Sequence, residues 1–343
     1  MHEAVPNLTV GDRAPDFALP SPDGTFYMFY ERARGRPMVM VFNPGGDAAQ
    51  NLKALVRRHD DFEAIGVDIF VVSLDDHETN AALDAPFLIW SDPKGAITDG
   101  YLAGASIETA DRVGMTAFLL DPNQRILGVL KGSGETVAEG ARAHFAGQPK
   151  MPPGIILHAA APVLVLPALI DRQTCRDLID RWHEEGHEEG TVGSVVDGSE
   201  FNRVYTKFKK RRDHRIMDMD LHRHLQQTIG KRIAPELAKA FHFEGFRFDR
   251  FLVVCYDGDR GDYFRPHRDN LSSETADRAF AMTVNLNAED YEGGELVFPE
   301  FGPHRYRAGT GGAVVFSCSL VHEALPVTKG ARFALLTFLR QAS

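Results

Sequence analysis

Hydrophobic positions in the first part of the chain, residues 38–146, follow two alternating patterns. Short apolar runs typical of buried strands, MVMVFNP, VDIFVVSLD and FLIWSD, are separated by stretches with helical spacing, such as AAQNLKALVRRHDDFEAIG and AEGARAHFA. Within TAFLLDPNQRILGVLKG, the Asp, Pro and Asn residues predict a tight turn between two further strands. This alternation predicts βαβ units and a mostly parallel sheet.

The pattern changes after residue 160. A strand-like VLVLPALI precedes a helix over 171–186, and residues 221–241 predict one or two further helices. From residue 248 onward, apolar runs follow one another with turns between them, namely FDRFLVVCYDGD, RAFAMTVNLN, GELVFPEF, GGAVVFS and ARFALLTFL. Such a series predicts an antiparallel sandwich or barrel of the jelly-roll type, here with flanking helices.

The break between the two patterns falls in GQPKMPPG, where proline and glycine crowd together. A chain of 343 residues suits two domains better than one. We therefore predict an α/β domain over residues 1–147, a linker over 148–159 and a β-rich domain over 160–343.

Composition and charge narrow the classes of partner. The formal net charge is −10, with a pI near 5.8, which argues against binding to nucleic acid or to an anionic membrane. The N-terminus lacks the pattern of a secretory signal, and no apolar run is long enough to span a bilayer. The scattered Cys175, Cys255 and Cys318 favour free, buried thiols, so we expect a reducing, cytoplasmic location.

Residues 10–132 carry a first family resemblance. The stretches VGDRAPDFALPSPDGTFYMF, VFNPGGD, WSDPKGAITDGY and FLLDPNQRILGV resemble the peroxiredoxin (AhpC/TSA) branch of the thioredoxin-like fold. In that family a loop proline is followed by a threonine four residues later and by the peroxidatic cysteine seven residues later. Counted from Pro44, those positions hold Ala48 and Asn51.

The remaining part of the peroxidase site is also missing. The family's arginine precedes a strand phenylalanine by three residues, and the residue three before Phe118 is Met115. The first cysteine of the chain is Cys175, outside this domain, whereas peroxiredoxin chemistry needs a thiolate nucleophile. The N-terminal half is therefore predicted to be catalytically degenerate and to serve as a scaffold, dimerisation or recruiting domain.

A short motif in the second half imitates a zinc site. Residues 183–187 read HEEGH, which formally matches the H-E-x-x-H pattern of zinc proteases. That pattern needs a continuous helix, and Gly186 interrupts it here. We interpret the stretch as the solvated end of the preceding helix.

A different group of residues has the composition of a metal site. In FRPHRDN, His267 and Asp269 are two residues apart, so an extended backbone would point both to one face. The best third ligand is His322, which follows an apolar strand in FSCSLVHEALPV. Two histidines and one carboxylate form the facial triad of non-haem Fe(II) oxygenases.

Arg332 adds a second signal ten residues after His322, at the start of the strand-like ARFALLTFL. A strand-borne arginine that points into a barrel can bind a carboxylate through two parallel hydrogen bonds. Because a buried guanidinium without an anionic partner is costly, Arg332 predicts either a structural ion pair or a bound acid.

With these residues in order, the C-terminal half resembles the Fe(II)- and 2-oxoglutarate-dependent dioxygenases, and among them the prolyl 4-hydroxylase-like group. The resemblance rests on H-x-D…H…R, on CYDGDRGDYFRPHRDN before it and on NLNAEDYEGGELVFPEFG after it. It implies a double-stranded β-helix (jelly-roll) domain. It also implies that His267, Asp269 and His322 bind Fe(II), that Arg332 binds the distal carboxylate of 2-oxoglutarate, and that Tyr256 hydrogen-bonds this co-substrate.

The same resemblance implies the reaction. O₂ and 2-oxoglutarate would be consumed, succinate and CO₂ released and a substrate hydroxylated, with ascorbate as a stimulant. The substrate stays open between a small molecule and a protein or peptide, and a homodimer through the thioredoxin-like domain is a further partner hypothesis. The basic KFKKRRDHR, residues 207–215, is either a lid that meets an acidic substrate or a solvated loop.

Two other classes of function compete with the hydroxylase. One is a thioredoxin-fold redox protein, which the missing cysteine opposes. The other is a non-catalytic binding or oxygen-sensing module, which the intact set of His267, Asp269, His322 and Arg332 opposes.

Overall fold

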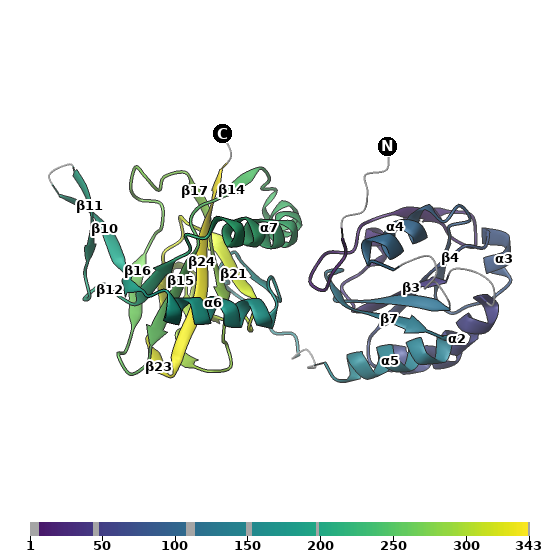
Figure 1. The fold of residues 1–343 in the computed structure, drawn as a ribbon. Coiled ribbons are helices and arrows are strands. Elements are labelled where there is room, and N and C mark those ends of the chain that lie inside the picture. Colours follow the sequence, from purple (N-terminus) through teal and green to yellow (C-terminus); the bar gives the residue numbers. More distant parts are fainter. Residues whose placement is uncertain (1–6, 44–47, 108–113, 149–152, 197–198, 342–343) are drawn as a thin grey trace. The chain divides into compact units, whose positions relative to one another are not determined.

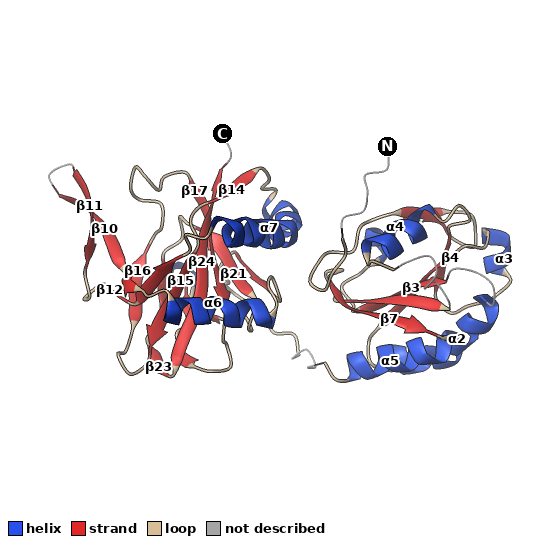
Figure 2. Ribbon diagram, viewed as in Figure 1, coloured by secondary structure: helices blue, strands red, loops and turns tan. Residues whose placement is uncertain are grey.

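The computed structural model describes residues 7–43, 48–107, 114–148, 153–196 and 199–341. The chain divides into two compact units, Met1–Pro153 and Gly154–Ser343. Figure 1 shows both units along the sequence, and Figure 2 shows that strands dominate the second. Of the predicted linker 148–159, residues 149–152 lie outside the described residues, so its limits stay a prediction.

The N-terminal unit contains a five-stranded sheet in the order β5-β4-β3-β6-β7. These strands are β5 (Leu88–Ser91), β4 (Asp68–Ser73), β3 (Met38–Asn43), β6 (Met115–Leu120) and β7 (Ile126–Gly132). Strands β3, β4 and β5 run parallel, but β6 pairs antiparallel with both β3 and β7. The prediction of parallel strands holds for β3, β4 and β5, whereas β6 runs antiparallel to both of its neighbours, and its tight turn to β7 can connect only antiparallel strands.

Helices cover both faces of this sheet. Val39 and Val41 of β3 pack on one face with apolar side chains of α2 (Ala48–Ala64) and α5 (Gly134–Ala146). The alternate residues Met38, Met40 and Phe42 pack on the other face, where α4 lies. The remaining elements are α4 (Ala96–Gly104), α1 (Phe29–Arg32), α3 (His77–Ala81) and the hairpin of β1 (Ala18–Pro20) and β2 (Phe26–Met28). This is a thioredoxin-like α/β fold.

The C-terminal unit contains two main antiparallel sheets. The larger has the order β8-β21-β17-β24-β15-β13-β9, with β14 beside β24. Its strands are β8 (Val163–Leu166), β21 (Ala313–Ser317), β17 (Arg278–Asn285), β24 (Ala331–Gln341), β15 (Leu252–Asp257), β13 (Arg212–Arg215), β9 (Glu188–Glu189) and β14 (Phe246–Phe248).

The smaller sheet has the order β12-β16-β22-β19-β20. Its strands are β12 (Lys209–Lys210), β16 (Tyr263–His267), β22 (His322–Ala324), β19 (Leu296–Val297) and β20 (Arg305–Tyr306). Two two-stranded sheets, β10 (Thr191–Val196) with β11 (Ser199–Val204) and β18 (Glu292–Gly293) with β23 (Val327–Lys329), and the 3-10 turn η2 (Pro299–Phe301) complete the strand-rich part. The two facing sheets form a jelly roll.

Alternation along β15 and β24 separates a helix-covered face from an inner face. Val253 and Cys255 belong to the hydrophobic core that also contains α6 (Arg172–Glu184) and α7 (Met219–Phe241), a single helix that includes Pro235. Their neighbours Val254 and Tyr256 belong to the core between the two sheets. Because side chains alternate across a strand, these elements aim polar residues at the interior of the jelly roll.

Within the described part of the chain, no helix combines the length and the apolar character that crossing a membrane requires.

Gly330 ends the turn that leads into β24, and it is expected to tolerate no side chain. Its φ is +72°, and a Cβ atom would lie 2.2 Å from the carbonyl oxygen of Asp290, whereas Gly245 has φ +64° and open space around it. We expect Gly245→Ala to cost about 1 kcal/mol of unfolding free energy through backbone strain alone. Gly330→Ala should cost roughly 1–3 kcal/mol more because of the clash.

Urea unfolding can measure this difference in a Trp90→Phe background, where Trp182 is the sole tryptophan and reports on the C-terminal unit. Equal destabilisation by the two substitutions would show that the close approach of Asp290 to Gly330 is unimportant.

Candidate active site

Strands β16 and β22 of the smaller sheet bring three candidate metal ligands together. His267 ends β16 and pairs in register with His322, the first residue of β22, with ring centroids 4.3 Å apart. Asp269 follows β16, and its amide N–H donates to the carbonyl of Cys318 at 3.0 Å. Its two carboxylate oxygens lie 3.5 Å from Nε2 of His267 and 3.3 Å from Nε2 of His322.

Backbone carbonyls fix which nitrogen of each histidine faces the carboxylate. Nδ1 of His267 lies 2.7 Å from the carbonyl oxygen of Arg265, and Nδ1 of His322 lies 3.1 Å from that of Leu320. A carbonyl oxygen only accepts hydrogen bonds, so each Nδ1 must carry a proton. In the neutral rings, both Nε2 atoms therefore direct lone pairs toward Asp269.

Three electron-pair donors that converge without a proton between them repel one another unless a cation lies among them. Ligand atoms of His267, Asp269 and His322 all lie within 4.8 Å of one another, and this is the one such group among the described residues. Imidazole nitrogens whose other ring nitrogen binds a carbonyl are typical of metal ligands. The donor set of two nitrogens and a carboxylate suits Fe(II) with open positions for other ligands.

The protonation states agree with metal binding. Burial lowers the pKa of His267, which favours the neutral ring that can donate its lone pair. Burial alone would raise the pKa of Asp269, but a proton on Nε2 of His267 or His322 lowers it well below its usual range, and a metal ion bound there would supply the same positive charge. The site therefore offers an ionised carboxylate and a neutral imidazole at neutral pH.

Aromatic rings hold the two imidazoles in place. The ring of Phe264 stacks on His267 with centroids 3.5 Å apart, and the ring of Phe316 lies 4.5 Å from His322. These contacts leave each ring little freedom to turn away from Asp269.

Arg332 lies inside the same cavity, on β24. It is 4% exposed, and its Nη2 donates to the hydroxyl of Thr283 at 3.3 Å. Its Nε is buried without a hydrogen-bond partner, and no carboxylate among the described residues forms an ion pair with it. A buried guanidinium with one neutral partner lacks the counter-charge that burial demands. Of the two alternatives that the sequence left open, the geometry therefore favours a bound acid over a structural ion pair.

Tyr256 stands opposite Arg332 in the register of β15 and β24. The guanidinium of Arg332 lies 5.3 Å from the centre of the Tyr256 ring. The phenol oxygen accepts a hydrogen bond from Nη1 of Arg211 at 3.0 Å, which leaves the phenol proton available to a ligand. The structure thus places Tyr256 beside Arg332, while its contact with a co-substrate stays a prediction.

Sequence reasoning missed the role of the basic segment 207–215. Strands β12 and β13 incorporate it, and Lys209 and Arg211 are buried in the cavity wall with the part-buried Asp213. The interpretation as a solvated loop is therefore wrong for these residues. The missed signal is their spacing of two, which points Lys209, Arg211 and Asp213 to one face of an extended chain.

A cavity of about 550 Å³ connects these groups. It is lined by the His267–Asp269–His322 group, by Arg332 with Thr283 and Tyr256, and by the basic wall of Lys209 and Arg211. One cavity therefore contains a candidate metal site, the unpaired guanidinium of Arg332 and a further charged surface. Its volume is large enough for a small co-substrate and part of a second molecule.

The HEEGH stretch forms no metal site. Helix α6 ends at Glu184, and Gly186 has φ +87°, so His183 lies on the helix and His187 beyond it. The ring of His187 instead stacks on Trp182 with centroids 3.7 Å apart.

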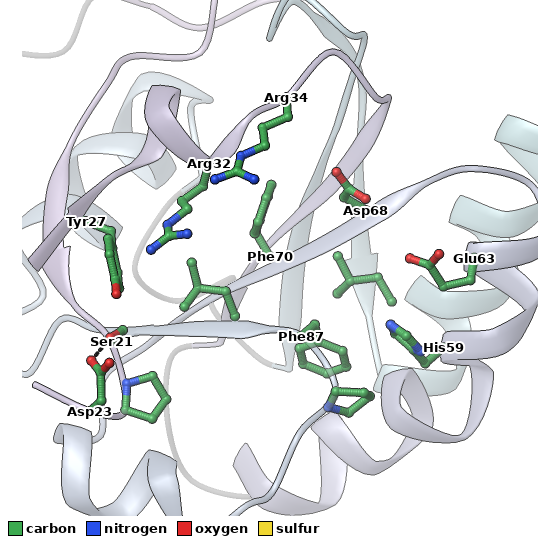
Figure 3. A pocket seen from close by; sticks show the side chains of 14 residues that line it. Ser21, Asp23, Tyr27, Arg32, Arg34, His59, Glu63, Asp68, Phe70 and Phe87 are labelled. Carbon is green, nitrogen blue, oxygen red and sulfur yellow. Dashed lines mark hydrogen bonds between the residues drawn. The ribbon is translucent and has the colours of Figure 1, made fainter. Parts of the chain in front are cut away.

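The degenerate peroxidase positions of the N-terminal unit lie away from its own cavity. Asn51 is on α2 and Met115 is buried at the start of β6, whereas Pro44 falls outside the described residues. A cavity of about 590 Å³ lies elsewhere in this unit, with Arg32 and His59 in its lining (Figure 3). No described residues there form a group of three metal-ligating side chains.

Comparisons with known proteins match each half to a different family. Residues 251–340 match the 2OG-Fe(II) oxygenase superfamily, and residues 10–129 match the AhpC/TSA family. The C-terminal half thus carries a 2OG-Fe(II) oxygenase domain. The matched region contains all three candidate ligands and Arg332, and the AhpC/TSA match covers the thioredoxin-like unit.

Curated relatives of the oxygenase domain are named PKHD-type hydroxylases. One from Alteromonas mediterranea is 44% identical over 62 residues, which is 18% of this chain and 27% of the relative. Another from Verminephrobacter eiseniae is 31% identical over 118 residues, which is 32% of this chain and 45% of the relative. The alignments thus span less than half the length of these relatives.

Solved structures similar to either half have low identity. A prolyl-4-hydroxylase of Pseudomonas putida has 17% identity and a TM-score of 0.40, over 54% of this chain and 95% of that one. The peroxidoxin BcpB of Mycobacterium tuberculosis has 19% identity and a TM-score of 0.37, over 42% of this chain and 99% of that one.

The buried Lys209 of the C-terminal unit predicts a specific pH dependence of stability. Burial lowers its pKa from 10.5 to about 7. Between these values the unfolded chain holds a proton on Lys209 that the folded chain has lost, so stability rises with pH in this window. We expect the wild type to gain stability relative to Lys209→Met from pH 7 to pH 10, with a slope that approaches about 1.4 kcal/mol per pH unit.

Urea unfolding at several pH values can measure this difference. Lys207→Met is the matched control, because Lys207 is exposed in the same segment, and its stability should run parallel to that of the wild type. A Lys209→Met curve that also runs parallel would mean that Lys209 keeps its ordinary pKa in the folded protein.

Proposed function

We propose that the protein is an Fe(II)- and 2-oxoglutarate-dependent hydroxylase. The observation that supports this most strongly is the convergence of His267, Asp269 and His322 beside a buried Arg332 that has no carboxylate partner among the described residues. The name of the curated relatives, PKHD-type hydroxylase, supports hydroxylation as the outcome.

His267 and His322 would bind Fe(II) through Nε2, and Asp269 through its carboxylate. Bound Fe(II) would supply the activation of O₂, coupled to decarboxylation of 2-oxoglutarate to succinate and CO₂. The residues of this chain fix the ligand atoms before the metal arrives, since backbone carbonyls hold both Nδ1 atoms and aromatic rings restrict both imidazoles.

Arg332 would bind the distal carboxylate of 2-oxoglutarate, with support from the Thr283 hydroxyl. Its Nε and Nη2 lie on one edge of the guanidinium, and Nη2 has a second N–H besides the one directed at Thr283, so this edge can match the two oxygens of a carboxylate. Tyr256 would donate its phenol proton to the same co-substrate. These three side chains lie on the inner face of the larger sheet and exclude water from that end of the cavity.

The AhpC/TSA domain is proposed to recruit substrate, to act as a scaffold or to form a homodimer. It contains no cysteine, so a peroxiredoxin-type peroxidase reaction is excluded for it. The three cysteines of the oxygenase half are free and buried, which fits a reducing compartment such as the cytoplasm. We further propose that ascorbate stimulates turnover.

Anaerobic titration with Fe(II) and 2-oxoglutarate tests this function. The wild type should develop a weak visible charge-transfer band, because the co-substrate would chelate the bound metal. His267→Ala should abolish the band through loss of a ligand. Arg332→Ala should retain it but need roughly 10- to 100-fold more 2-oxoglutarate, because a charge-assisted hydrogen-bond pair is lost.

His304→Ala is the matched control, since His304 is exposed in the same unit, and it should behave like the wild type. A folded wild type that shows no band would contradict the hydroxylase proposal and favour a non-catalytic binding or oxygen-sensing module.

A further inference from the structure

The cavity has more cationic than anionic side chains along one wall, which we call the cationic wall: Lys209, Arg211, Arg250 and Arg278. Two of its members share a single carboxylate. Nζ of Lys209 lies 3.3 Å from Asp213, while Nε and Nη2 of Arg211 lie 2.7 Å and 3.1 Å from the same side chain. One carboxylate therefore serves two basic side chains at this end of the wall.

At the other end of the wall, two arginines also share one carboxylate, but a second carboxylate balances their charge. Arg278 and Arg340 both bind Asp249, at 2.9 Å and 3.0 Å, and Arg340 has Asp277 as a second partner. Arg250 lies between the two ends in sequence and lines the cavity, yet no carboxylate among the described residues forms an ion pair with its guanidinium.

Lowered pKa values of two wall residues agree with electrostatic crowding. Burial lowers the pKa of Arg250, and the neighbouring Arg278 lowers it further, although the nearby carboxylates of Asp249 and Asp213 offset part of this effect. Burial likewise lowers the pKa of Lys209, with Arg211 as the next cause and Arg250 as a smaller one. Like charges that weaken one another in a cavity are stabilised when an anion binds between them.

The remaining charged residues of the cavity do not supply that anion. Asp269 belongs to the candidate metal site, and Glu274 is exposed at the rim. Arg268 has its own partner, Glu300, at 2.7 Å. The excess of positive charge is local, because the whole chain has a formal net charge of −10.

The co-substrate has a separate place. In the proposed function, Arg332 binds the distal carboxylate of 2-oxoglutarate, and its other end meets the metal. The guanidinium groups of Arg332 and Arg211 lie 5.3 Å and 5.7 Å from the centre of the Tyr256 ring. The ring therefore lies beside both arginines. Lys209 and Arg250 have no contact with Arg332 among the described interactions, and they remain for a second molecule.

We propose that the molecule to be hydroxylated carries an anionic group, a carboxylate or a phosphate, which binds between Lys209 and Arg250. This inference rests on the proposed hydroxylase function. The anchor would position the reacting carbon toward His267, Asp269 and His322. It would also favour anions over neutral analogues, because a neutral molecule offers Lys209 and Arg250 no additional negative charge.

Anion binding can be measured without turnover. Full-length protein is loaded with Zn(II), which is redox-inactive, and with saturating 2-oxoglutarate. It is then titrated calorimetrically with succinate, with inorganic phosphate and with neutral succinamide. We expect millimolar binding of at least one anion and none of succinamide. The tighter of the two anions indicates which group the substrate carries.

Substitutions assign that binding to the wall. Lys209→Gln and Arg250→Gln should each weaken the anion at least tenfold, whereas Lys207→Gln, which changes an exposed lysine of the same segment, should leave it unchanged. The affinity for 2-oxoglutarate, taken from the anaerobic Fe(II) band, should stay at the wild-type value in all three variants.

Three outcomes would overturn the proposal of an anionic substrate. They are no binding of either anion, equal anion affinity in Lys209→Gln, Arg250→Gln and the wild type, or a loss of 2-oxoglutarate affinity in these two variants that matches their loss of anion affinity. With the wild-type Fe(II) band intact, each of these leaves the hydroxylase function standing. Absence of that band in the wild type would reject the hydroxylase function instead.

Discussion

The pairing of β16 with β22 is the constraint on which the candidate site depends. Phe264 pairs with Ala324, and His267 pairs with His322, so the register shifts by one residue between the two pairs. Without this bulge Pro266 would stand opposite His322, and His267 would point to the face opposite that of Phe264. The extra residue turns His267 onto the same face as Phe264, where the two rings stack. Proline suits the irregular position, because it has no N–H to give to the ladder.

The larger sheet contributes through a second constraint, the alternation of its side chains. Residues of β15 and β24 that face α6 and α7 are apolar, and these contacts fix the strands in place. The same strands must then direct Tyr256 and Arg332 inward. An ionised side chain removed from water costs several kcal/mol unless it is paired. The interior of this jelly roll therefore contains a buried positive charge without a negative partner. A ligand that supplies the negative charge stabilises the folded state by mass action.

The sequence predicted the order of elements and the convergence of the site better than it predicted the sheets. A spacing of two for His267 and Asp269 and an apolar strand before His322 were enough to anticipate that these residues meet; their role as iron ligands stays a prediction. The bulge in β16 was not visible, because it depends on the register with a strand far along the chain. The antiparallel entry of β6 was missed for a related reason, since strand order depends on tertiary packing and not on local pattern.

The basic segment shows a different limit of sequence reasoning. A run of charged residues is most often solvated, and KFKKRRDHR has no apolar alternation to mark a strand. Its burial depends on partners elsewhere, since β12 pairs with β16 and β13 with β15. Those pairings place Lys209 and Arg211 against the cavity, where Asp213 offsets only part of their charge. The secondary-structure propensities of single residues do not predict such pairings between distant strands.

The N-terminal unit shows why fold and chemistry must be argued separately. Its two hydrophobic cores use alternate residues of β3 and the apolar faces of the helices, and neither core includes Asn51, the position of the missing thiol. A Cβ atom on Gly134 would lie 2.0 Å from the carbonyl oxygen of Asn51, so α5 packs against the main chain of α2, and the Asn51 side chain adds one hydrogen bond from the Gly134 N–H at 3.4 Å. A thiolate could therefore be absent at this position without disturbing the fold. By the same reasoning, the jelly roll of the C-terminal unit is no argument for hydroxylation in itself, and the proposal rests on the charged and metal-ligating side chains within its cavity.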